Sequence, residues 1–280
     1  MNTVAIIGTG LIGGSFGLAL RASGFAGRIL GVSSPAAIRP ALDCGAIDAG
    51  VPLAEAAAQA DLIFLAQPIG RILDTIRHLD PLVRPDALVT DAGSTKCEIA
   101  DTAREHLRRC QFLGGHPMAG KEKRGAGEAE ADLFRDRTWV LTPDDPAELE
   151  TAAARDFTSW LDRFGARIVV LDADEHDRVV SFTSHLPQLA STALAATVAD
   201  NLTVPDDLQV AGPGLLDSTR LALSAYELWR DILATNTESI EQALTAYINE
   251  LEQLRENLRT RGAQAEFVRA AALAAHLRGR

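Results

Sequence analysis

The chain lacks the features that mark secreted, membrane-spanning and nucleic-acid-binding proteins. Its 280 residues contain only Cys44, Cys97 and Cys110, whose odd number and spacing fit reduced thiols in a cytoplasm rather than disulfides or a metal site. No apolar run approaches the roughly 20 residues that span a bilayer, and the N-terminus has no basic, cleavable leader. The 38 acidic and 27 basic side chains give a net charge of −11, which disfavours a polyanionic partner. We therefore expect a cytoplasmic protein with no metal ion and with neither nucleic acid nor a membrane as partner.

The first residues carry the most informative pattern. Residues 4–7 form a short apolar run that is typical of a strand buried on both faces. The run leads into the glycine pattern GTGLIG at 8–13 and then into an apolar segment compatible with a helix. In this context the glycines predict a dinucleotide site: Gly8 permits a tight turn, Gly10 lets backbone N–H groups approach a pyrophosphate, and Gly13 allows close helix packing. The predicted cofactor contacts are Gly8, Gly10, Leu11, Ile12, Gly13 and, farther along the chain, Pro68. The alternative is a glycine-rich turn that binds nothing.

The second strand ends without the acidic residue of an NAD-specific site. That residue usually lies about 20 positions past the glycines and binds the ribose 2′-hydroxyl. Here Ser33 and Ser34 follow the apolar run 28–32, so no carboxylate repels a 2′-phosphate and two hydroxyls can donate to it. The nearest arginine, Arg39, lies several residues on. We expect NAD or NADP to bind, with NADP accepted at least comparably. The alternative is that Ser33 contacts the ribose of NAD through water.

Apolar runs and helical periodicity alternate along the first part of the chain. Strands are predicted at 4–7, 28–32, 61–65, 88–91, 111–114, 138–141 and 167–171. Strands separated by helices indicate a doubly wound, mainly parallel sheet, and from residue 174 on the pattern is almost wholly helical. The predicted architecture is an α/β Rossmann domain that binds NAD(P), residues 1–171, followed by an all-α domain for substrate binding and dimerisation, residues 172–280.

The helical half predicts a homodimer. The segment 185–199 is rich in alanine and leucine nearly all the way round, and a helix of that kind is normally surrounded by other helices. A helical half attached by one edge to a sheet domain would leave much apolar surface exposed in a monomer. The alternative is a compact helical domain that buries its own apolar faces.

Four segments carry polar side chains that are expected beyond the carboxyl ends of the strands, where ligands bind in open α/β sheets. Ser94, in DAGSTK at 91–96, is either a helix N-cap or a site hydroxyl. His116 follows two glycines and precedes a proline, so we expect it on a solvent-facing loop, where it can act as a general base. His185 is expected at a helix start, where it either points at an anionic ligand or caps the helix. Arg220 follows a glycine loop and either clamps a carboxylate or forms a surface ion pair.

Together these motifs resemble the prephenate/arogenate dehydrogenase family, the oxidoreductases of tyrosine biosynthesis. The resemblance covers essentially the whole chain and rests on GTGLIGGS, DAGSTK, GGHPMAGKEKRG, SHLPQ, DSTRLA and LWRDI. It implies a Rossmann domain followed by a helical dimerisation domain. It also implies oxidation of prephenate to 4-hydroxyphenylpyruvate, with loss of CO₂ and hydride transfer to NAD(P)⁺. An arogenate dehydrogenase, which forms tyrosine directly, is the alternative within the family.

The resemblance implies roles for individual residues. By the family pattern His116 accepts the proton of the ring hydroxyl as hydride leaves, and Ser94 orients that hydroxyl and the nicotinamide. Arg220 matches an arginine that holds a substrate carboxylate, and His185 matches a histidine at the side-chain end of the substrate. Glu122 matches an acidic residue associated with substrate selection.

Two departures from the family pattern concern preference rather than the reaction. Lys121 stands where a small residue is common, and Gln188 follows SHLP where a histidine is common. Two other classes of function stay open on the residues alone. A dimeric NAD(P) sensor without catalysis would need the glycine loop but not the polar set of Ser94, His116, His185 and Arg220. A 3-hydroxyacid dehydrogenase would carry a catalytic lysine in the second domain, and no lysine occurs from 173 to 280.

Overall fold

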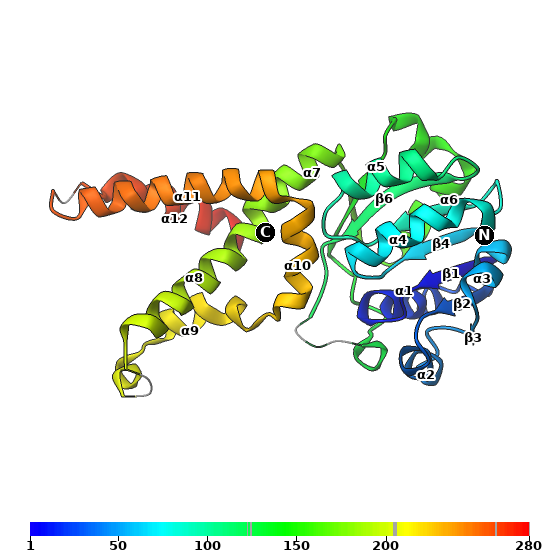
Figure 1. The fold of residues 1–280 in the computed structure, drawn as a ribbon, viewed down its shortest axis with the longest axis horizontal. Helices are drawn as coiled ribbons and strands as arrows, with labels where there is room; N and C mark the ends of the chain where they lie inside the picture. The colour runs from blue at the N-terminus through cyan, green and yellow to red at the C-terminus, as the bar shows by residue number, and fades with distance from the viewer. Residues whose placement is uncertain (122, 124, 204–205, 261, 280) are drawn as a thin grey trace.

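The protein folds into a sheet domain followed by a group of helices that extends away from it (Figure 1). The structure is a computed structural model and describes residues 1–121, 123, 125–203, 206–260 and 262–279. The strands are β1 (Thr3–Ile7), β2 (Arg28–Val32), β3 (Ala49–Gly50), β4 (Leu62–Leu65), β5 (Leu88–Asp91), β6 (Gln111–Pro117), β7 (Thr138–Thr142) and β8 (Arg167–Val170). The helices are α1 (Leu11–Ala22), α2 (Pro35–Asp43), α3 (Leu53–Gln59), α4 (Ile69–Leu79), α5 (Cys97–His106), α6 (Ala152–Arg163), α7 (Ala173–Val180), α8 (Leu186–Asn201), α9 (Pro213–Thr219), α10 (Tyr226–Thr235), α11 (Thr237–Asn257) and α12 (Gln264–Arg278).

The strands form one twisted sheet in the order β3-β2-β1-β4-β5-β6-β7-β8. The pairings between the described strands are parallel except that of β6 with β7. Successive side chains of a strand point to opposite faces. The central strands therefore contribute side chains to two separate hydrophobic cores, one on each face of the sheet. Ile6 and Phe64 pack on one face with Phe16 of α1, while Ile7 and Leu65 pack on the other. The predicted doubly wound, mainly parallel sheet is confirmed.

Strand β6 is longer than the sequence pattern predicted. The run 111–114 was expected to end at the paired glycines, but pairing with β7 extends the strand to Pro117. The glycines are there because the strand is crowded: a Cβ on Gly115 would lie 2.7 Å from the carbonyl oxygen of Asp91, and one on Gly114 would lie 2.3 Å from Thr142 Oγ1. Glycine in a strand interior can mark such a close approach as well as a loop. His116 is therefore a strand residue.

The first two helices of the second part are joined without a break. A π-helical turn, Ser181–His185, connects α7 to α8. Pro187, in the first turn of α8, has no N–H to donate to the preceding turn, and a widened turn is one way in which a helix accommodates this. His185 therefore lies directly before α8, as expected, but its side chain does not cap that helix, and the helical turn before it continues from α7.

The helical part has little core of its own. Its buried apolar side chains, among the described residues, are Val180, Ile232, Ile240 and Ala243. Most of the exposed large apolar side chains of the protein lie in this part, and α8 and α11 diverge from each other with distance from the sheet domain (Figure 1). A compact helical domain that buries its own apolar faces is therefore ruled out. Among the described residues, no helix combines the length and apolar character needed to cross a membrane.

Candidate active site

The glycine loop has the geometry of a cradle for a dinucleotide. Gly8 adopts φ +98°, and a Cβ there would lie 2.5 Å from the carbonyl oxygen of Ala66. A Cβ on Gly13 would lie 2.0 Å from the carbonyl oxygen of Gly8, whereas the space in front of Gly10 is open. Leu11 and Ile12 begin α1 directly after Gly10, so the N–H groups that lack partners in the first helical turn face this open position.

The neighbouring loops complete one side of that cradle. Ser33 and Ser34 follow β2 and are exposed, next to the point where the Gly8 N–H donates to the carbonyl oxygen of Val32 at 2.8 Å. Arg39 Nε donates to Asp43 Oδ1 at 3.0 Å on the surface of α2, so the nearest arginine already has a partner. Pro68 lies at the N-terminus of α4, two residues after the Ala66 carbonyl that Gly8 faces.

His116 lies at the same edge of the sheet, because β5 and β6 run parallel to β4 and β1. The predicted exposed loop position is wrong: the side chain is only 9 % exposed. Its Nδ1 lies 2.8 Å from His176 Nε2, and His176 Nδ1 lies 2.7 Å from Asp177 Oδ1. Burial, followed by repulsion from His176, Lys96 and His185, holds the pKa of His116 well below 6.5. The ring is therefore neutral at physiological pH and able to accept a proton.

The start of α5 is capped from the second part of the chain. Asp177 Oδ1 accepts from the backbone N–H of Lys96 at 2.7 Å, and Oδ2 accepts from that of Cys97 at 3.0 Å. The possibility that Ser94 caps this helix is thereby excluded. The Ser94 hydroxyl is half-buried and makes no hydrogen bond to another described residue, so it is free to bind a ligand.

A buried ion pair supports the strand that carries His116. Lys96 Nζ pairs with Asp91 Oδ2, and both side chains are fully buried. The same ammonium donates to the carbonyl oxygen of Gly115 at 2.8 Å, while the N–H of Gly115 donates to Asp91 Oδ1 at 3.0 Å. Burial lowers the pKa of Lys96, and the charge of Asp91 opposes this effect. The pair thus fixes the backbone immediately before His116.

His185 lies on the other side of the same network. It is buried, its Nδ1 lies 3.3 Å from Asn236 Nδ2, and its ring meets the Trp229 ring edge to face at 5.9 Å between centroids. Asn236 also donates to the carbonyl oxygen of Asp177 at 2.8 Å. Burial is the main reason that the pKa of His185 falls to about 4. His185 therefore offers a hydrogen bond, but no charge, at neutral pH.

The remaining predicted residues that the structure describes lie outside the hydrogen-bond network around His116. Arg220 is exposed and begins a 3₁₀ turn, Arg220–Leu223, that packs against α8. Gln188, one of the two departures from the family pattern, is buried and donates to the carbonyl oxygen of Leu221 at 2.9 Å, so it fixes the segment of Arg220. Lys121, the other departure, pairs with Glu130. Glu122 lies outside the described residues.

The pattern missed His176, Asp177 and Asn236 and gave Lys96 no role. For His176 and Asp177 the sequence held one signal. They lie four and three residues before Val180, on the same face of a short helix that has few apolar residues to bury. Two polar residues on the buried face of such a helix need partners elsewhere, but the sequence does not say where those partners are.

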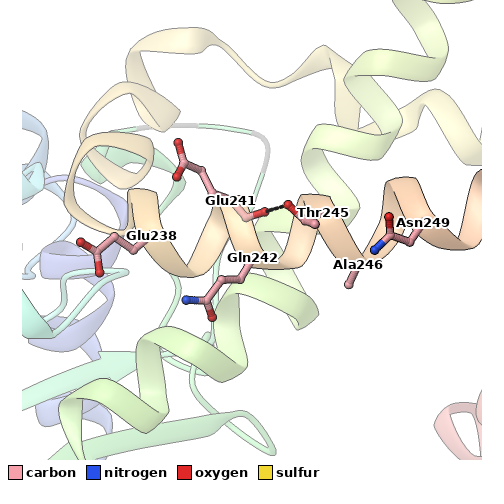
Figure 2. Close-up of a pocket in the computed structure, with 6 residues that line it drawn as sticks. All are labelled: Glu238, Glu241, Gln242, Thr245, Ala246 and Asn249. Carbon is pink, nitrogen blue, oxygen red and sulfur yellow. Dashed lines mark hydrogen bonds between the residues drawn. The ribbon is translucent and has the colours of Figure 1, made fainter.

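A separate groove runs along α11 and contains none of the predicted site residues (Figure 2). It has a volume of about 570 Å³ and is lined by Glu238, Glu241, Gln242, Thr245, Ala246 and Asn249. All of these come from one helix, so the groove is an open helix face and not an enclosed ligand site.

The strand order reverses between β1 and β4, and the glycine cradle lies at that point of the sheet edge. A buried neutral histidine lies at the same edge and is contacted by His176 of the helical part. These are the features of a nicotinamide-dependent dehydrogenase. The family description "Prephenate dehydrogenase, nucleotide-binding domain" matches residues 16–170, and "Prephenate dehydrogenase, dimerization domain" matches residues 172–273. The chain therefore belongs to the prephenate dehydrogenase family of oxidoreductases, and the predicted membership is confirmed.

Individual relatives agree with this assignment. The chain is 32 % identical to the prephenate dehydrogenase of Lactococcus lactis over 95 % of its own length and 73 % of that protein. It is 33 % identical to the enzyme of Bacillus subtilis over 91 % and 69 %. The crystal structure of Aquifex aeolicus prephenate dehydrogenase with hydroxyphenyl propionate and NAD⁺ superposes with a TM-score of 0.89 at 30 % identity, covering 99 % of this chain and 98 % of that one. Synechocystis arogenate dehydrogenase gives a TM-score of 0.81 at 30 % identity, covering 99 % of both chains.

Proposed function

We propose that the protein oxidises and decarboxylates prephenate to 4-hydroxyphenylpyruvate, with His116 as proton acceptor. The observation that carries this proposal is a buried histidine held neutral beside the glycine cradle. NAD(P)⁺, held at the glycine loop, would supply the acceptor for the hydride that leaves the hydroxyl-bearing ring carbon. His116 takes the hydroxyl proton, and the ring carbon becomes a carbonyl. The bond to the ring carboxylate then breaks, its electron pair completes the aromatic ring as CO₂ leaves, and His116 returns its proton to the resulting phenolate oxygen. The half-buried hydroxyl of Ser94 orients the substrate hydroxyl.

The cofactor is held by the residues around the open position at Gly10. Gly8 and Gly13 shape the loop, Leu11 and Ile12 supply N–H groups to the pyrophosphate, and the Pro68 loop lies against the same turn. Residues 1–171 form the cofactor domain in this proposal, and residues 172–280 supply the substrate contacts and the dimer contacts.

The residue expected at the side-chain end of the substrate, His185, favours prephenate over arogenate. Arogenate carries an ammonium group where prephenate carries a keto group, and His185 is neutral at physiological pH. A neutral donor suits a keto acid and gives no counter-charge to an ammonium group. Offering prephenate and arogenate separately in a cofactor-reduction assay tests this choice, and a higher kcat/KM for arogenate would reverse it.

Arg220 is proposed to hold a substrate carboxylate. Arg220→Ala should raise KM for prephenate at least about tenfold, which corresponds to about 1.4 kcal/mol, while kcat suffers less, because the lost contact is made in the ground state as well as the transition state. Arg178→Ala, which removes an exposed arginine paired with Glu175, is the matched control. A loss confined to kcat would instead assign Arg220 to the transition state.

The loop after β2 predicts use of both cofactors. With Ser33 in place of an acid, NADP⁺ should be accepted at least comparably to NAD⁺, and Ser33→Asp should shift the preference to NAD⁺ by repelling the 2′-phosphate. Arg39→Ala should leave the ratio nearly unchanged, since Arg39 is engaged with Asp43. Values of kcat/KM for the two cofactors test this. A wild-type preference for NAD⁺ above about 100-fold, about 2.7 kcal/mol, would contradict it.

We also propose a homodimer formed by the helical part. Leu251, Leu258 and Phe267 are among the large apolar side chains that this part leaves exposed, and a second copy can cover them by a two-fold contact. Light scattering should give twice the chain mass at micromolar concentration, and Leu251→Asp should shift the population towards monomer. Glu241→Ala, a polar position on the groove of α11, is the control. A monomeric wild type would refute the dimer.

A further inference from the structure

His116 is backed by two further polar residues, His176 and Asp177. Both come from α7 and are almost completely buried. They form a chain of contacts that runs from Asp177 Oδ1 to His176 Nδ1, 2.7 Å, and from His176 Nε2 to His116 Nδ1, 2.8 Å. The chain ends at His116, whose Nε2 takes no part in it.

The identity of each group decides where the protons lie in this chain. Asp177 accepts from the N–H groups of Lys96 and Cys97, which favours its ionised form, and an ionised carboxylate only accepts hydrogen bonds. His176 Nδ1 must therefore carry the proton in that contact. In a neutral imidazole the other nitrogen is then an acceptor, so His116 must donate from Nδ1. The lone pair of neutral His116 is left on Nε2.

We propose that His176, fixed by Asp177, is a positioning residue that holds His116 in the Nδ1–H tautomer and so leaves Nε2 free to take the proton of the substrate hydroxyl. This proposal rests on the proposed function, in which His116 is the base. When Nε2 gains the proton, the positive ring keeps its Nδ1–H bond to His176, and the carboxylate of Asp177 lies one ring away. No proton leaves His176 in this step, and none is taken up by Asp177.

A purely structural role of this pair would not require a histidine at position 176. Asp177 alone joins α7 to the N-terminus of α5 through the two backbone N–H groups, and this joint does not need an imidazole at position 176. The contact between Asp177 and α5 holds α7 beside the sheet, so that His176 of α7 can support His116 of β6. Substitutions at 176 can therefore separate support of the tautomer from support of the fold.

The tautomer can be measured on the unaltered protein. In the full chain labelled with ¹⁵N-histidine, long-range ¹H–¹⁵N spectra at neutral pH should show His116 with a protonated Nδ1 and an unprotonated Nε2, assigned by the loss of its signals in His116→Asn. A His116 ring with its proton on Nε2 would overturn the proposal. This result does not depend on whether any variant at 176 folds.

Two variants then test the consequence for the reaction. His176→Leu removes the acceptor, and His176→Gln can put an amide oxygen in its place. His176→Leu should lower kcat about tenfold or more, the low end of what a general base contributes, with little change in KM for either substrate. His176→Gln should recover most of that loss, and His78→Leu, an exposed histidine on α4, should change nothing.

The outcomes separate this inference from the proposed function. Wild-type kcat in His176→Leu, or equal loss in the Leu and Gln variants, would overturn the positioning role while leaving His116 as base if His116→Asn is impaired. Full activity of His116→Asn would instead overturn the proposed function itself.

Discussion

Replacing His116 by Asn should lower kcat by about 10²–10⁴-fold, the range that a general base contributes, while KM for prephenate changes little. The reason is that Asn keeps a polar side chain in the buried position on β6 but cannot take up the hydroxyl proton as hydride leaves. Steady-state kinetics with saturating cofactor measure both constants. A variant that keeps more than about a tenth of the wild-type kcat, on the same scale, would remove His116 from the reaction.

The pH dependence of the wild type follows from the same side chain. His116 acts only while neutral, and its pKa is held well below 6.5 by burial, with repulsion from His176, Lys96 and His185 acting in the same direction. The neutral fraction is therefore near its maximum at physiological pH and falls only as the pH drops through the lowered pKa. We expect kcat to stay level from neutral pH down past 6.5 and to decline below that. A decline centred at or above 6.5 would mean that the base is more exposed than β6 and α7 allow.

The cofactor half of the site could be predicted from sequence because its signals are local. A glycine pattern between a strand and a helix fixes the turn at Gly8 and the contact at Gly13 within a few residues of chain. Likewise, the bounds of β2 follow from a short apolar run and were predicted to the residue. No contact distant in sequence is needed for either.

The support of the catalytic histidine could not be predicted, because its contacts join residues far apart in the chain. His116 and His176 are 60 residues apart, and Lys96 and Asp177 are 81. Two glycines and a proline around His116 gave the pattern of a loop, whereas the antiparallel partner β7 turns the same residues into a buried strand. Pairing with β7 therefore puts the base in the interior instead of in solvent, and burial there lowers its pKa.

The largest loss of stability should come from Lys96. Lys96→Met keeps most of the side-chain volume but leaves Asp91 fully buried without its cation, and removing one partner of a buried ion pair costs about 3–5 kcal/mol. The melting temperature of the variant should fall sharply at fixed protein concentration. Lys123→Met is the matched control, since Lys123 is exposed and pairs with Glu128, and such surface pairs contribute at most about 1 kcal/mol.

Adding Asp91→Asn to Lys96→Met identifies the cause of the lost stability. In Lys96→Met with Asp91→Asn, the buried charge is gone while an amide oxygen can still accept from one of the two N–H groups, of Gly93 and Gly115, that Asp91 binds. The double variant should therefore melt above Lys96→Met alone, although below the wild type. Equal or lower stability of the double variant would mean that Lys96 acts through packing rather than charge. Because the pair fixes the backbone just before His116, any loss of kcat in Lys96→Met should also be partly restored in the double variant.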